Sequence, residues 1–194
     1  TELICMNWKG DFLMFDQIHE ECGVFGVYSP ESTPSVVGDT YMALYALQHR
    51  GQQSCGIAVN DDGIIRSYRD LGLVPDTFNQ RVLSDLGSGR MAVGHVLYGA
   101  SNPERADAQP LVVRHIKGSM ALAFNGALVN ALELKDELEL KGAIFHSNPD
   151  AEIISHVIIN ERLHTNSIEE AIEKAMDKLK GAYSMVVMSP QKLM

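Results

Sequence analysis

Cysteine is scarce in this sequence: its 194 residues contain three, Cys5, Cys22 and Cys55. Their number is odd, their spacings are wide, and no Cys-x-x-Cys pair occurs, which argues against a disulfide framework and against a zinc site. We therefore expect reduced thiols in a cytoplasmic protein, with no metal bound by this chain.

Positive charge is also in short supply. Sixteen Lys and Arg residues stand against 25 Asp and Glu residues, which gives a formal net charge of −9. No basic stripe is present, so neither nucleic acid nor an anionic membrane surface is an expected partner. The acidity does not suit a polyphosphate site either, and no glycine-rich nucleotide loop of either common type occurs. A phosphorylated substrate, if there is one, would bind elsewhere.

Long apolar runs are missing as well. No segment approaches the roughly 18 apolar residues of a membrane span. The first residues lack the apolar stretch of a signal peptide. We interpret 1–21 as a leader or as upstream sequence, with Met14 as a candidate start. The rest, 22–194, is long enough for one domain with a sizeable core.

The order of the predicted elements favours an α+β sandwich. Strand-like segments dominate the first part, helical segments the second, and a strand returns at the end, which suits sheets covered by helices. Asn60-Asp61-Asp62-Gly63 predicts a hairpin turn, and Gly181 predicts a helix C-cap. Predicted strands cover 22–28, 57–60, 64–68, 91–96, 111–113, 119–124 and 183–188, and predicted helices begin near 36, 130, 150 and 168. The predicted capping pairs are Asn130 with Glu133 and Ser167 with Glu170.

Cys22 is the strongest candidate for catalysis. An internal cysteine in an apolar strand is most often an inert core residue, but His19, Glu20 and Glu21 make the junction before it polar and accessible. If the bond between Glu21 and Cys22 is cut, Cys22 gains an α-amine whose ordinary pKa is about 8. That amine could take the thiol proton, so that one residue would supply both nucleophile and base.

Five further positions could complete a site that hydrolyses an amide. Asn125 and Gly126 end a predicted strand and offer two donors to an oxyanion, although Asn-Gly is also a common turn. Arg50 and Gly51 either cap a predicted helix or form a wall of a substrate pocket. Asp150 either caps a helix or holds the α-ammonium group of an amino acid.

Together these segments resemble the N-terminal glutaminase domain of amidophosphoribosyltransferase, the enzyme of the first committed step of purine synthesis. The motifs occur in the family's order, and the resemblance covers about 22–190. The matching pieces are Cys22-Gly-Val-Phe-Gly, Leu47-Gln-His-Arg-Gly-Gln52, Gly94-His-Val96 with Tyr98, Gln109-Pro110, Asn125-Gly126, Asp150 with Glu152, and Lys180-Gly-Ala-Tyr183.

The resemblance implies an Ntn-hydrolase fold, a four-layer αββα sandwich of two antiparallel sheets, cut short at its C-terminus. It implies that a leader, 1–21, is removed and that 22–194 is an incomplete class II glutamine amidotransferase domain. Cys22 would attack the glutamine side-chain amide and form a glutamyl thioester, with Asn125 and Gly126 at the oxyanion. The remaining implied roles are Asp150 at the α-ammonium group and Arg50 with Gly51 closing the site.

The implied partners are glutamine and a phosphoribosyltransferase domain. That domain would use the released ammonia to displace pyrophosphate from phosphoribosyl pyrophosphate, and it lies outside this sequence. Mg²⁺ and, in some relatives, a 4Fe-4S cluster would belong to that domain, so no cofactor is expected within this chain. A homo-oligomer is an open alternative.

Several positions depart from the family pattern. Leu97 stands where the family has an arginine that would hold the glutamine α-carboxylate, and leucine cannot make that bidentate contact. Ala100 replaces an expected threonine, and Phe124 replaces the histidine before Asn-Gly. One alternative is therefore a non-catalytic remnant that acts as a binding or interaction module. Another is a related Ntn hydrolase whose substrate lacks a free carboxylate.

Overall fold

The computed structural model describes residues 5–6, 12–13, 22–30, 36–99, 104–146 and 150–194. The predictions for most of the leader, for Ala100 and for the residue before Asp150 lie outside these ranges. Within the described ranges, no helix has both the length and the apolar character needed to span a bilayer.

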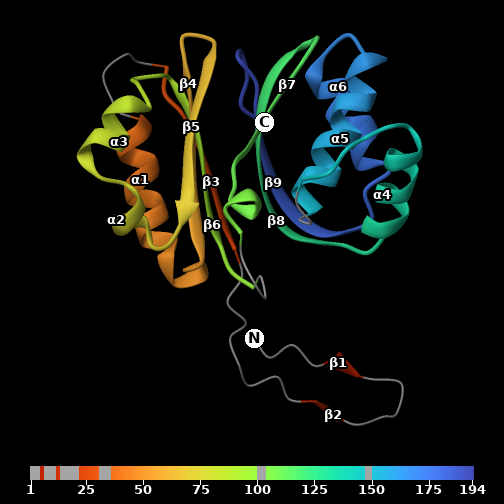
Figure 1. The fold of residues 1–194 in the computed structure, drawn as a ribbon, viewed down its shortest axis with the longest axis horizontal. Helices are drawn as coiled ribbons and strands as arrows, with labels where there is room; N and C mark the ends of the chain where they lie inside the picture. The colour runs from red at the N-terminus through yellow and green to blue at the C-terminus, as the bar shows by residue number, and fades with distance from the viewer. Residues whose placement is uncertain (1–4, 7–11, 14–21, 31–35, 100–103, 147–149) are drawn as a thin grey trace.

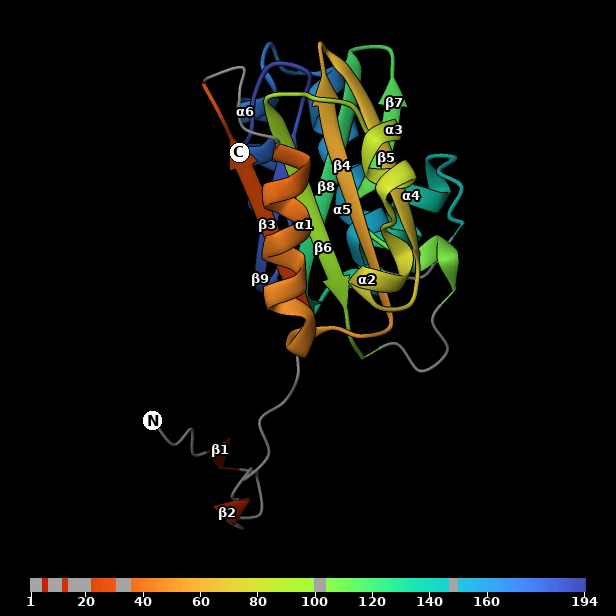
Figure 2. The same cartoon turned by 90° about the vertical axis from the view of Figure 1, so that its left-hand side faces the viewer.

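The body of the protein consists of two antiparallel sheets packed between two layers of helices (Figure 1). The first sheet has the strand order β3-β6-β4-β5, and the second has the order β7-β8-β9. Helices α1, α2 and α3 cover the outer face of the first sheet, and α4, α5 and α6 cover the outer face of the second. Turning the molecule shows α1 lying across β3, β6 and β4 (Figure 2). The predicted αββα sandwich is confirmed.

The strands of the body are β3 (Gly23–Tyr28), β4 (Ser54–Asp61), β5 (Ile64–Leu71), β6 (Met91–Leu97), β7 (Leu111–His115), β8 (Gly118–Leu128) and β9 (Gly181–Met188). A separate short pair consists of β1 (Cys5–Met6) and β2 (Phe12–Leu13). The helices are α1 (Val36–Leu47), α2 (Val74–Thr77), α3 (Gln80–Asp85), α4 (Ala131–Leu140), α5 (Asp150–Leu163) and α6 (Ile168–Met176). Two 3-10 turns, η1 (Gln48–Arg50) and η2 (Arg105–Asp107), complete the set.

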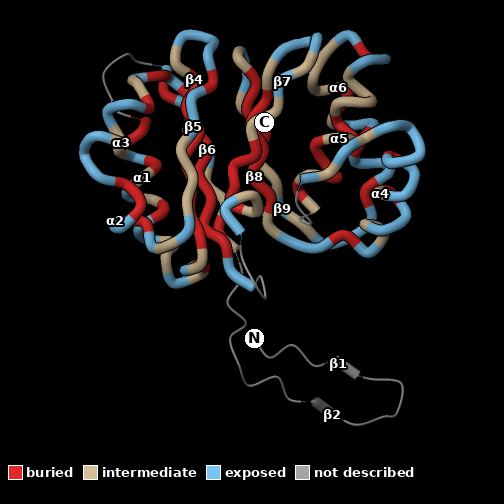
Figure 3. The backbone as a smooth tube through the Cα atoms, viewed as in Figure 1, coloured by how far each residue is buried: buried red, intermediate tan, exposed pale blue. Residues whose placement is uncertain are grey.

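Three apolar layers hold the sandwich together, and the central strands are buried along most of their length (Figure 3). Side chains alternate across a strand, so β4 sends Ile57 toward the helices and Ala58 toward the second sheet. Ala58 packs there with Val93 and Ala121. Burial on both faces explains why β4 and β6 are apolar almost throughout.

The β4–β5 hairpin forms as its turn residues predict. Asp62 and Gly63 both have positive φ, 51° and 85°, which is the geometry of a two-residue hairpin turn that favours an Asp-Gly pair. The side chain of Asn60 accepts a hydrogen bond from the Gly63 N–H at 2.8 Å and closes the turn.

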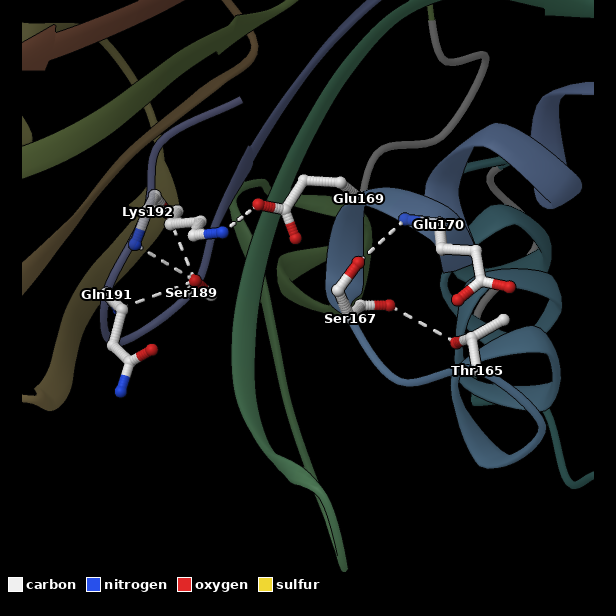
Figure 4. Close-up of polar contacts among 7 residues, drawn as sticks. All are labelled: Thr165, Ser167, Glu169, Glu170, Ser189, Gln191 and Lys192. Carbon is white, nitrogen blue, oxygen red and sulfur yellow. Dashed lines mark hydrogen bonds and ion pairs between the residues drawn. The ribbon is translucent and has the colours of Figure 1, made fainter.

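Ser167 caps α6 as predicted, and its hydroxyl accepts a hydrogen bond from the Glu170 N–H at 3.2 Å (Figure 4). The Glu170 carboxylate does not return to Ser167; it accepts from the Asn166 N–H at 3.3 Å. The predicted box is thus half formed. Ser189 makes a similar local turn nearby by accepting from the Lys192 N–H at 3.1 Å.

Two other local predictions are wrong. Asn130 precedes α4 but makes no side-chain cap; its amide donates to Lys178 O at 2.9 Å and accepts from Lys180 N at 3.0 Å. The side chain ties the start of α4 to the chain entering β9. Gly181 opens β9 and does not cap α6, which ends at Met176. A glycine is needed there because its φ is +154° and a Cβ would collide with the Ala127 carbonyl.

The first sheet and its helices match the prediction only in part. The predicted strand after Cys22 forms as β3, which lies at the edge of its sheet and leaves Tyr28 58% exposed. Short helices α2 and α3 were not predicted. Asn79 caps α3 by accepting hydrogen bonds from Arg81 N and Val82 N.

Candidate active site

Cys22 opens onto a pocket of about 620 Å³ between the ends of the two sheets. The first sheet contributes the segment just before β3 and the segment just after β6, and the second contributes β8 and β9. The lining residues are Cys22, Tyr98, Gly99, Asn125, Gly126, Ala127, Ala182, Tyr183 and Ser184. The structure therefore brings together the three residues predicted to be catalytic, Cys22, Asn125 and Gly126.

The main chain of Tyr98 holds the Cys22 thiol. The Tyr98 N–H donates to Sγ at 3.4 Å, and the thiol donates to the Tyr98 carbonyl at 3.4 Å. In the intact sequence the nitrogen of Cys22 is bonded to Glu21. The α-amine that would act as base therefore exists only after cleavage at that bond.

Arg50 and Gly51 lie next to this pocket without lining it. Arg50 Nε donates to the Cys22 carbonyl at 3.4 Å, so the η1 turn is tied to the backbone of Cys22. Gly51 packs against the end of β6, where a Cβ would lie 2.7 Å from the Val96 carbonyl carbon. The Gly51 N–H caps the η1 turn after α1 by donating to the Gln48 carbonyl at 3.2 Å, and the role of this segment as a wall of the substrate pocket stays a prediction.

One edge of β8 carries backbone N–H groups that point away from β9. Since β7 pairs with β8 only as far as Leu122, the following residues have no strand partner on that side. The Phe124 N–H donates to Gln109 Oε1 at 2.7 Å, and the Leu128 N–H donates to Asp150 Oδ2 at 2.7 Å. Backbone groups alternate in direction along a strand. The Gly126 N–H therefore points to the same open edge, where Gly126 lines the pocket.

The conformation of Gly126 is one that other residues avoid. Its φ is +138°, and a Cβ would lie 2.5 Å from Tyr183 Cα and would collide with the Ala182 carbonyl. Glycine is thus required by both the backbone angle and the close approach of β9. Asn125 and Gly126 do not form a turn, because both residues lie within β8.

Asp150 is the first residue of α5 and does not line the pocket. Its carboxylate is anchored to the β8 edge through Leu128, two residues beyond Gly126. That separation corresponds to roughly 7 Å along a strand. The structure therefore places Asp150 beside the edge that carries Gly126.

His95 is fully buried, as expected of a core histidine. Its Nε2 is 2.9 Å from the Phe124 carbonyl, which it reaches across the space between the sheets. Burial lowers the pKa of His95 to about 4, and the bond to Phe124 opposes this shift only in part. The ring is therefore neutral at physiological pH, and Nε2 carries the proton that Phe124 accepts. Its Nδ1 has no hydrogen-bond partner in the described part of the chain.

Leu97 shares the face of β6 that carries His95, because the two residues are two positions apart. It is 9% exposed and lies directly opposite Ser54 in β4. The apolar Leu97 thus occupies the position where the family pattern has an arginine. The Ser54 hydroxyl opposite it is buried and makes no hydrogen bond to a described residue.

Cys55 belongs to the other side of the first sheet. It is fully buried among residues that face α1 and α2, and burial raises the pKa of its thiol to about 11. It is unsuited to nucleophilic chemistry. Across the described ranges, no group of three His, Cys, Asp or Glu side chains comes together as a metal site.

Local sequence signals missed the pocket walls Ala182 and Ser184 and the contact of Gln109 with Phe124, because each depends on a distant segment.

Comparison with known proteins gives consistent results. A family model described as a glutamine amidotransferase domain matches residues 100–194. The amidophosphoribosyltransferase of Methanocaldococcus jannaschii is 44% identical over 86% of this chain, and that of Bacillus subtilis is 38% identical over 89%. The chain spans 35% of the length of each of these relatives.

The solved structures agree. The glutamine phosphoribosylpyrophosphate amidotransferase from B. subtilis, complexed with ADP and GMP, has a TM-score of 0.77 and 37% identity over 86% of this chain. A structure described as the allosteric regulatory enzyme of purine biosynthesis has a TM-score of 0.78 and 36% identity. The matches cover 35% of each of those chains. The chain is therefore a glutamine amidotransferase domain homologous to the N-terminal domain of the amidophosphoribosyltransferases.

Proposed function

We propose that Cys22 becomes the N-terminal residue of the protein and hydrolyses the side-chain amide of glutamine. One observation carries this proposal: Cys22 and the Gly126 backbone come from opposite sheets and line the same pocket. A nucleophile and a preorganised N–H on facing walls are what attack on an amide carbonyl requires.

The reaction would proceed in two steps. The α-amine of Cys22 takes the thiol proton, and sulfur attacks the amide carbon of glutamine. The oxygen that gains negative charge is stabilised by the Gly126 N–H and the Asn125 side-chain amide. The tetrahedral intermediate collapses, the C–N bond breaks, and ammonia leaves with a proton from the α-ammonium group. Water then hydrolyses the glutamyl thioester, which releases glutamate and regenerates the thiol.

Asp150, Arg50 and Gly51 would make the contacts to the rest of the glutamine molecule. The Asp150 carboxylate accepts from the N–H of Leu128, two residues beyond Gly126 on the same edge of β8, which suits a carboxylate that binds the α-ammonium group of glutamine. Arg50 and Gly51 would close the site beside Cys22, in keeping with the contact of Arg50 to the Cys22 carbonyl.

The ammonia would serve a second domain. Because this chain spans 35% of its relatives' length, we infer a phosphoribosyltransferase domain as its partner. There, ammonia would displace pyrophosphate from phosphoribosyl pyrophosphate at the start of purine synthesis. Any Mg²⁺ or iron–sulfur cluster would belong to that partner.

A non-catalytic role is the second candidate, and Leu97 is the observation that favours it. Losing a desolvated, bidentate contact to a carboxylate costs roughly 2–5 kcal/mol of binding free energy. A pocket without that contact would bind glutamine weakly, or would accept an amide that lacks a free carboxylate.

Glutamine hydrolysis by the processed protein tests the proposal. Intact mass first establishes that the chain begins at Cys22. Wild-type protein and Cys55→Ala should release glutamate from glutamine, whereas Cys22→Ala should not. If the processed wild-type protein releases no more glutamate than Cys22→Ala at saturating glutamine, glutamine hydrolysis by Cys22 is contradicted.

A further inference from the structure

We propose that Gln109 and His95 are positioning residues that clamp the Phe124 peptide and so hold Asn125 and Gly126 opposite Cys22. The proposal rests on the proposed function, since it assigns a role toward the oxyanion donors of that reaction. Neither side chain lines the pocket, and both bond to Phe124 of β8, so we expect their shared effect on the reaction to pass through β8.

Gln109 acts as a substitute for a missing strand. Its Oε1 accepts from the Phe124 N–H at 2.7 Å, and its Nε2 donates to the Phe124 carbonyl at 3.3 Å. These are the two bonds that a neighbouring antiparallel residue would make. The side chain is 3% exposed and lies two residues before β7 begins. It thus extends the edge pairing of β8 past Leu122, where β7 no longer reaches.

His95 makes the second bond to the same peptide from the opposite sheet. Its Nε2 donates to the Phe124 carbonyl at 2.9 Å, so that carbonyl accepts two hydrogen bonds. A buried, neutral imidazole keeps this proton in place at physiological pH. His95 lies on β6, and Tyr98, just beyond the end of that strand, contacts Cys22 Sγ. The same strand therefore contacts both the nucleophile and the peptide next to the oxyanion donors.

Hydrogen bonds to the Phe124 peptide thus connect β8, which carries Asn125 and Gly126, to β6, which leads to Tyr98 and Cys22. Phe124 is bonded covalently to Asn125, so a displaced Phe124 peptide shifts both oxyanion donors relative to sulfur. A misplacement of about 1 Å can reduce a rate by about a hundredfold. We expect Gln109→Leu to lower kcat for glutamine hydrolysis by about ten- to a hundredfold.

The test compares these variants with a matched control. Asn60→Leu also removes a buried side-chain link between the two sheet regions, from Asn60 Nδ2 to the Pro190 carbonyl at 2.7 Å. Asn60 pairs with Met91, at the end of β6 away from Cys22. His95→Gln keeps an N–H donor, whereas His95→Leu does not. For each variant, kcat and KM for glutamine and the rate of Cys22 alkylation by iodoacetamide are measured.

The clamp predicts a specific pattern. Gln109→Leu and His95→Leu lower kcat with KM changed less than about twofold, because the donors act mainly in the transition state. Iodoacetamide alkylation of Cys22 is unchanged, because substitution at a saturated carbon forms no oxyanion. His95→Gln recovers most of the lost kcat, and Asn60→Leu has little effect. An unchanged kcat in Gln109→Leu, or an equal loss in Asn60→Leu, overturns the proposal.

Amide hydrogen exchange separates this proposal from the proposed function. The Asn125 and Ala127 amides should exchange faster in full-length Gln109→Leu but not in Asn60→Leu. If processed wild-type protein does not hydrolyse glutamine, the proposed function fails, and exchange alone decides the clamp. Equal exchange in the two variants, or none faster than wild type, then overturns it.

Discussion

The Tyr98 N–H lies 3.4 Å from Cys22 Sγ, and this contact joins the residue just after β6 to the residue just before β3. Because the two residues are 76 positions apart, the contact exists only in the folded protein. It directs the thiol toward the pocket that Asn125 and Gly126 line from the second sheet. The Cys22 sulfur is therefore both a contact between distant segments of the fold and the proposed nucleophile.

The two described cysteines should differ sharply in reactivity. Cys22 is partly exposed at the pocket, whereas Cys55 is fully buried with its thiol pKa raised to about 11. At pH 8 only about one Cys55 thiol in a thousand is ionised. In a Cys5→Ser background, iodoacetamide should modify Cys22 and spare Cys55 until denaturant is added. Mass mapping of the native protein checks this, and modification of Cys55 at a comparable rate would contradict the assignment.

Gly126→Ala should be severely destabilising. Its side chain meets the β9 backbone, and its φ of +138° is unfavourable for alanine. Gly118→Ala is the matched control, because Gly118 is also in β8 and has a φ of +126° but no atom near its Cβ position.

Urea unfolding separates strain from collision. Gly118→Ala should cost about 1 kcal/mol, since only the backbone angle is unfavourable. Gly126→Ala should cost about 3 kcal/mol or more, since overpacking adds to that strain. Equal losses in the free energy of unfolding would mean that β9 does not approach Gly126 closely.

Acid should destabilise the protein through His95. Its pKa is about 4 in the folded protein and about 6.5 in the unfolded chain, so the unfolded chain binds more protons between those values. The stability from this group is complete above about pH 6.5 and decreases as the pH falls toward 4. The decrease from pH 7 to pH 5 should be about 2 kcal/mol.

Two histidine variants separate the contribution of His95 to acid destabilisation from that of the other groups. Urea unfolding of His95→Gln should show a shallower loss of stability from pH 7 to pH 5, although its stability at pH 7 is itself lowered. His164→Gln, which changes an exposed histidine, should retain the wild-type slope. A wild-type slope in His95→Gln would show that His95 protonation does not limit stability in acid.

Leu97→Arg should strengthen glutamine binding. The new guanidinium would lie on the face of β6 that carries His95, next to the Ser54 hydroxyl, which has no hydrogen-bond partner among the described residues. A restored carboxylate contact of roughly 2–5 kcal/mol would lower KM by about 30-fold or more while kcat changes little. Leu97→Met, which adds no charge, is the control. If KM for glutamine is the same in both variants, the missing arginine is not what weakens the site.

Sequence reasoning succeeds here where a structure depends on near neighbours. The hairpin at Asp62-Gly63 follows from turn chemistry alone, and the Ser167 cap depends on a donor three residues away. It fails where a side chain chooses a distant partner. Asn130 has the right spacing for a cap, yet it bonds to Lys178 and Lys180 in the segment that leads into β9.

The candidate site shows the same division. Residue chemistry singles out Cys22, Asn125 and Gly126, and the structure brings all three to one pocket. The clamp on Phe124 could not be predicted, because Gln109 is 15 residues and His95 is 29 residues from their shared partner. Their contacts arise only because β7 begins at Leu111, after Gln109, and because the two sheets face each other.

The most direct test of the account is the site of modification by a diazoketone analogue of glutamine. Such a reagent needs both a nucleophile and a pocket that recognises glutamine. The account predicts a single adduct on Cys22 in protein that begins at that residue, and no adduct in Cys22→Ala or in protein that retains Thr1 to Glu21. An adduct on another residue, no adduct on the processed protein, or equal labelling with the leader attached would contradict it.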